Sequence, residues 1–83
     1  MTTTEVIQVM IVDDHAVFTE SLATALDRQD GITVVATSSG DDEVTALAGR
    51  HQPDVVLLDY RLPGQDGLRL ASELKAAAPE ARI

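Results

Sequence analysis

Three short apolar runs, separated by stretches with helical spacing, most constrain how this chain can fold. The runs are Val6–Val12, Ile32–Ala36 and Val55–Leu58, and all are rich in the β-branched or apolar residues that favour buried strands. Strands that alternate with helices pair in parallel through right-handed crossovers, with helices on both faces of the sheet. The sequence therefore predicts an α/β fold built on a parallel sheet.

The segments between and after these runs carry apolar residues at the spacing of one helix face. We expect a first helix from His15 to about Gln29, capped by Asp14 or a neighbouring residue. The third helix should end just before Pro79, because proline cannot continue a helix. The predicted order is strand, helix, strand, helix, strand, helix.

The second helix has a start signal of its own. Ser39 and Asp42 have the spacing of a capping box, and the helix should run from there to about Arg50. After the third helix, Arg82 and Ile83 indicate the first residues of another strand. The predicted fold therefore breaks off as a fourth strand begins.

Length and charge limit the possible roles. At 83 residues the chain holds one small domain, expected over residues 6–83 with residues 1–5 as a flexible N-terminal tail. Fourteen acidic against six basic residues give a net charge of −8, which repels phosphate backbones and anionic lipid. The sequence has no secretion signal and no apolar run of membrane-spanning length, so we expect a cytoplasmic protein. We expect this acidic segment to contact neither DNA nor a membrane.

Acidic residues follow two of the predicted strands at their carboxyl ends. Asp13 and Asp14 follow the first strand, and Asp59 follows the third. Ligands of open parallel sheets bind beyond this edge. If the two strands are neighbours, about 4.8 Å apart, the three carboxylates share one pocket. Two such charges about 4 Å apart repel by roughly 4 kcal/mol at an effective dielectric constant near 20, so the cluster calls for a cation.

Oxygen donors without cysteine suit Mg²⁺, with Mn²⁺ as the second choice. Beside such an ion, one carboxylate can attack phosphorus as a nucleophile. Asp59 is the better candidate because it stands alone next to a turn, whereas Asp13 and Asp14 suit the metal side. The alternative interpretation is structural, since acids after strands also cap helices and solvate loops.

Four other polar residues near these segments have structural explanations and are not assigned to the site. His15 fits a first-turn position, and His51 fits an exposed connection. Asp54 fits the start of a strand, and Asp66 fits a cap of the third helix.

The runs Val12–His15, Pro53–Asp59 and Tyr60–Gly67, in this order, resemble the receiver domain of bacterial two-component response regulators, most closely those with a C-terminal helix-turn-helix output domain. The resemblance covers Val6–Ile83. It implies a flavodoxin-like (CheY-like) doubly wound parallel sheet, here truncated after the third helix at the start of the fourth strand. The family's Thr or Ser and its Lys, which bind the phosphoryl group, belong to later strands.

The resemblance also implies roles for particular residues. Asp59 would accept a phosphoryl group from a sensor histidine kinase, and the metal ligands would be Asp13, Asp14, Asp59 and the backbone carbonyl of Arg61. Such a module catalyses at most its own phosphorylation and is not otherwise an enzyme. It normally controls a DNA-binding output domain, which this sequence does not include.

Two other function classes stay open on the sequence alone. One is a metal-dependent phosphatase or phosphotransferase with an aspartate nucleophile, and the other is a non-phosphorylated dimerisation module. Whichever function applies, truncation should leave Val55–Leu58 as an exposed apolar edge strand and the first helix incompletely covered. We therefore expect the chain to self-associate.

Overall fold

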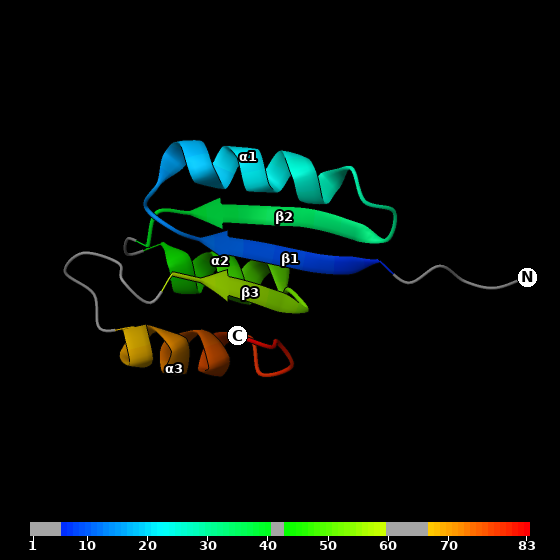
Figure 1. The fold of residues 1–83 in the computed structure, drawn as a ribbon. Helices are drawn as coiled ribbons and strands as arrows, with labels where there is room; N and C mark the ends of the chain where they lie inside the picture. The colour runs from blue at the N-terminus through cyan, green and yellow to red at the C-terminus, as the bar shows by residue number, and fades with distance from the viewer. Residues whose placement is uncertain (1–5, 41–42, 60–66) are drawn as a thin grey trace, which may run out of the picture.

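The computed structural model describes residues 6–40, 43–59 and 67–83, in which strands and helices alternate as predicted (Figure 1). The elements are β1 (Ile7–Val12), α1 (Ala16–Asp27), β2 (Ile32–Ser38), α2 (Val44–His51), β3 (Val55–Leu58) and α3 (Gly67–Ala77). Both strand pairs are parallel, and the strand order is β2-β1-β3. Within the described ranges, no helix has the length and apolar character needed to cross a membrane.

The strand β1 lies between its two neighbours and sets the level of the carboxyl edge. Its last residue, Val12, lies opposite Ser38 of β2 and Leu58 of β3. The pairing with β2 shifts between Val9 and Met10, where β2 carries one extra residue. The three strands nevertheless end together, so the residues that follow them lie at one edge.

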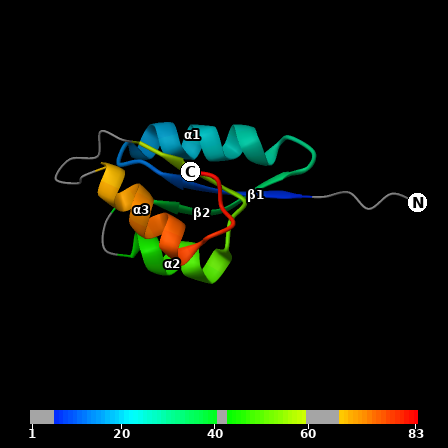
Figure 2. The same cartoon turned by 90° about the horizontal axis from the view of Figure 1, so that it is seen from below.

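Helices cover both faces of the sheet, with α1 on one side and α2 and α3 on the other (Figure 2). Successive side chains of a strand point to opposite faces. Met10 and Val12 therefore pack into the core on the α2 and α3 side, whereas Ile11 lines the side of α1. The buried cluster on the α2 and α3 side consists of Met10, Val12, Val44, Ala48, Val56, Leu70, Leu74, Ala78 and Ala81.

The predicted capping is correct in position for one helix and wrong for another. The N-cap of α1 is His15, the neighbour of Asp14, and its side chain makes no capping hydrogen bond. The N-cap of α2 is Glu43, which excludes Ser39 from that role; Asp42, its predicted capping-box partner, lies outside the described residues. The physical reason at Ser39 is that β2 continues to Ser38 to pair with all of β1, beyond the predicted end at Ala36.

The predicted start of another strand is present at the outer edge of β3. Arg82 forms an isolated parallel bridge with Val55. Its N–H donates to the carbonyl oxygen of Asp54 (N···O 2.9 Å), and its own carbonyl accepts the N–H of Val56 (2.8 Å). Two backbone hydrogen bonds therefore hold this segment against β3.

Candidate metal centre

Backbone hydrogen bonds fix the residues that follow β1 and β3. The Asp13 N–H donates to the carbonyl oxygen of Ser38 at the end of β2 (N···O 3.0 Å). The Asp59 N–H donates to the carbonyl oxygen of Val12, the residue before Asp13 (2.9 Å). Asp13 and Asp59 are therefore the first residues beyond two adjacent parallel strands, and their side chains start from one edge of the sheet.

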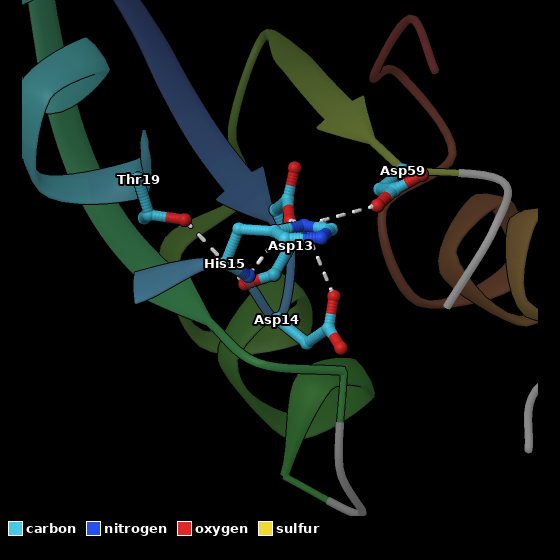
Figure 3. Close-up of polar contacts among 5 residues, drawn as sticks. All are labelled: Asp13, Asp14, His15, Thr19 and Asp59. Carbon is cyan, nitrogen blue, oxygen red and sulfur yellow. Dashed lines mark hydrogen bonds and ion pairs between the residues drawn. The ribbon is translucent and has the colours of Figure 1, made fainter. Parts of the chain in front are cut away.

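The ring of His15 lies among the carboxylates of this edge (Figure 3). Its Nδ1 is 2.6 Å from Asp13 Oδ1, 3.2 Å from Asp14 Oδ1 and 3.7 Å from Asp59 Oδ2. Asp13 Oδ1 also accepts the backbone N–H of His15 at 2.9 Å. The first turn of α1 thus holds the ring between acids that come from β1 and β3.

Burial differs among the four side chains. Asp13 and Asp59 are 13% and 11% exposed, Asp14 is 33% exposed, and His15 is 66% exposed. The hydrogen bond with the Asp13 carboxylate, followed by the charges of Asp13, Asp14 and Asp59, raises the pKa of His15 above its ordinary value of 6.5. A protonated ring at this place offsets part of the repulsion among the carboxylates.

The donor atoms fit a divalent cation. One carboxylate oxygen each from Asp13, Asp14 and Asp59, with a ring nitrogen of His15, lie within 4.8 Å of one another. Carboxylate oxygens are the donors that Mg²⁺ and Mn²⁺ prefer. Arg61, the remaining predicted ligand, lies outside the described residues.

An open hollow of about 550 Å³ adjoins the acids between α1 and β3. Phe18, in the first turns of α1, is 55% exposed, and Leu57 of β3 is 40% exposed. Apolar side chains line most of the hollow, and the acids and His15 lie at one end. Its lining residues are Ile11, Asp13, His15, Phe18, Leu22, Leu57, Leu58 and Asp59.

The structure thus brings together the three acids that the sequence places at strand ends. Asp54 lies at the opposite end of β3, where its Oδ2 accepts the N–H of Gln8 (2.8 Å), so it serves the sheet edge. His51 is the last residue of α2, and Asp66 lies outside the described residues.

Two residues of the site region were not predicted from the sequence. His15 was assigned a bland first-turn role, although its position directly after an acid pair was the available signal. The buried Thr19, one turn later, donates its hydroxyl to the Asp13 carbonyl oxygen (3.4 Å). That contact depends on the orientation of α1 relative to the end of β1, which the spacing of residues in the sequence does not specify.

Comparisons with known proteins identify the family of the chain. The family model of the response regulator receiver domain matches residues 9–83. The chain is 34% identical over 79 residues to a probable transcriptional regulatory protein NarL of Mycobacterium tuberculosis, covering 95% of this chain and 37% of that protein. It is 37% identical over 73 residues to a protein-glutamate methylesterase/protein-glutamine glutaminase of Oleidesulfovibrio alaskensis, covering 88% of this chain and 20% of that protein.

Solved structures give the same result. A two-component response regulator of the LuxR family from Aurantimonas sp. SI85-9A1 superposes with a TM-score of 0.83 at 30% identity, covering 95% of this chain and 56% of that one. This chain therefore spans less than two thirds of the length of these relatives. The match over residues 9–83, the strand order and the shared fold lead to one conclusion: the chain belongs to the response regulator receiver domain family.

Proposed function

We propose that Asp59 accepts a phosphoryl group from the phosphohistidine of a sensor histidine kinase. The observation that carries this proposal is the convergence of Asp13, Asp14 and Asp59 at one edge of the sheet in a chain of the receiver family. Asp59 is the acceptor because it is the first residue after β3, whereas Asp13 and Asp14 are an adjacent pair of acids after β1. Residues 6–83 would then form part of the receiver domain; residues 1–5, the predicted tail, lie outside the described residues.

The transfer exchanges one bond for another at phosphorus. A carboxylate oxygen of Asp59 forms the new P–O bond while the P–N bond to the donor histidine breaks, and the electron pair leaves on the imidazole nitrogen, which takes a proton from solvent. The product is an acyl phosphate on Asp59. The backbone hydrogen bond from Asp59 to Val12 holds the nucleophile in place for this attack.

The carboxylates of Asp13, Asp14 and Asp59 would hold Mg²⁺, or Mn²⁺ in its place, together with the backbone carbonyl of Arg61 that the resemblance implies. When bound, the ion screens the negative charge that keeps a carboxylate and a phosphoryl group apart. The donor chemistry supports this assignment, because oxygen atoms of three carboxylates lie within one small volume.

We further propose that the domain regulates an output domain in a longer cytoplasmic protein. The M. tuberculosis relative is described as a transcriptional regulatory protein, and the Aurantimonas protein as a LuxR-family regulator. The output domain, and not this acidic segment, would then contact DNA. In this role the chain modifies its own Asp59 and does not turn over a separate substrate.

The test is intact-mass analysis after incubation with a small phosphodonor, such as acetyl phosphate, and Mg²⁺. We expect the addition of one phosphoryl group to the wild type, lost on treatment with base. Asp59→Asn should give no adduct, and Asp54→Asn is the matched control, since Asp54 is the acid at the other end of the same strand. An adduct that persists in Asp59→Asn, or its absence from the wild type, would overturn the proposal.

A further inference from the structure

The spacing of His15 from the three carboxylates is that of one metal ligand from another. Ligands about 2.1 Å from an ion in an octahedron lie about 3 Å apart when adjacent and about 4 Å apart when opposite. The Nδ1 of His15 is 2.6, 3.2 and 3.7 Å from the nearest oxygens of Asp13, Asp14 and Asp59. A small movement of the exposed ring would therefore place Nδ1 in the coordination shell of an ion held by these acids.

The fold presents His15 to this position. Its backbone N–H is bonded to Asp13 Oδ1, and the carbonyl oxygen of His15 accepts the N–H of Thr19 within the first turn of α1 (2.9 Å). The side chain itself is 66% exposed, and its ring lies among Asp13, Asp14 and Asp59 (Figure 3). The backbone is thus fixed while the ring can turn to meet an ion.

We infer that His15 is a specificity-determining residue of the cation site and supplies a nitrogen ligand to borderline transition-metal ions such as Co²⁺, Ni²⁺ and Zn²⁺. Imidazole nitrogen suits these ions, whereas Mg²⁺ is satisfied by carboxylate, carbonyl and water oxygens. The ligating ring is the neutral one, with its proton on Nε2, so binding through Nδ1 releases any proton on that atom to solvent. This inference rests on the proposed cation site of Asp13, Asp14 and Asp59.

The experiment measures binding of Mg²⁺, Ni²⁺ and Co²⁺ by calorimetry to the wild type, to His15→Ala and to His51→Ala. His51 is the matched control because it is the other histidine of the chain and lies at the end of α2. We expect His15→Ala to weaken binding of Ni²⁺ and Co²⁺ about tenfold or more and to change binding of Mg²⁺ less than about twofold. His15→Gln, whose amide also reaches the pocket, serves as a second variant if the alanine variant does not fold.

The visible absorption spectrum of bound Co²⁺ distinguishes a ligand from a structural residue. If His15 only supported the fold, its substitution would leave this spectrum unchanged. A nitrogen ligand alters the position and intensity of the cobalt bands, so the spectrum of His15→Ala should differ from that of the wild type, and that of His51→Ala should not. Equal losses for Mg²⁺ and Co²⁺, tighter binding of all ions by His15→Ala, or unchanged spectra would overturn the inference. Absence of any ion binding by the wild type would overturn the proposed cation site as well, which distinguishes the two failures.

Discussion

The backbone N–H of Asp59 donates a hydrogen bond to the carbonyl oxygen of Val12, with an N···O distance of 2.9 Å. This bond extends the ladder between β1 and β3 by one residue and sets Asp59 beside Asp13. The sheet therefore sets the backbone position of the proposed acceptor. Substitution of its carboxylate should change the chemistry of the site and leave the fold intact.

Metal binding should stabilise the folded chain, because the three acids meet only in the native state. At a concentration of Mg²⁺ one hundred times its dissociation constant, we expect a gain of about 2.7 kcal/mol in the free energy of unfolding. Asp59→Asn and Asp14→Asn should lose most of this gain and, without metal, should be more stable than the wild type by roughly 1 kcal/mol, since each removes a like charge.

Thermal unfolding with and without Mg²⁺ measures both effects. Asp54→Asn is the control and should keep the full gain, because its side chain contacts Gln8 and not the acid cluster. An equal Mg²⁺ gain in Asp59→Asn and the wild type would show that the ion binds elsewhere.

The pKa of His15 should lie above 6.5 in the folded chain, because the ring is hydrogen-bonded to Asp13 and faces the charges of Asp14 and Asp59. NMR titration of the ring protons measures this pKa, with His51→Asn used to assign the signals. Asp13→Asn should bring the pKa back toward 6.5, and Mg²⁺ should also lower it, since a cation among the acids opposes the charge on the ring.

The raised pKa also fixes the sign of a stability effect. A group whose folded pKa exceeds its unfolded value stabilises the native state fully below the unfolded pKa, here about 6.5, and loses that contribution as the pH rises through the folded pKa. The metal-free wild type should therefore lose stability relative to His15→Gln over this interval. A constant difference in melting temperature between the two proteins across it would contradict the assignment.

Leu74 and Leu68 provide a matched test of the core, since both are leucines of α3. Leu74 is fully buried, whereas Leu68 is 86% exposed. Leu74→Ala should lower the free energy of unfolding by about 2–5 kcal/mol, because it removes buried apolar surface and leaves a cavity. Leu68→Ala should change it by no more than about 0.5 kcal/mol. Denaturant titration measures both, and similar losses would place Leu68 in a buried interface.

Self-association remains a prediction, and the exposed apolar side chains between α1 and β3 are where it should occur. Phe18 and Leu57 both line the hollow there. Sedimentation equilibrium should reveal a dimer that Phe18→Glu or Leu57→Lys shifts toward the monomer. Leu68→Glu is the control for added charge, since Leu68 does not line that hollow. A monomer at all accessible concentrations of the wild type would refute the prediction.

The element order and the sheet edge followed from the sequence because both depend on local signals. The apolar run Val55–Leu58 is bounded by Pro53 and Asp59, and the observed β3 has the same limits. In a parallel sheet, residues at the carboxyl ends of the strands share one edge. The sequence alone therefore predicts that Asp13 and Asp59 lie near each other. The hydrophobic pattern and the parallel topology were therefore sufficient to predict the limits of β3 and the edge that holds the acids.

The start of α2 and the place of the His15 ring could not be predicted in the same way. Ser39 and Asp42 have capping spacing, yet the long pairing of β2 with β1 moves the start of α2 to Val44. The direction of the His15 ring is set by the carboxylates of Asp13, Asp14 and Asp59, the last of which is remote in sequence. Both outcomes depend on tertiary contacts, which outweigh weak local preferences.

The strand order has a consequence for how the chain is made. Of the three described strands, β1 is synthesised before β2 and β3, but it lies between them in the sheet. It can form hydrogen bonds along both edges only after Leu58 has been synthesised. A nascent chain that ends before Val55 therefore carries Asp13 and Asp14 without the acceptor, and one edge of β1 is open to other chains.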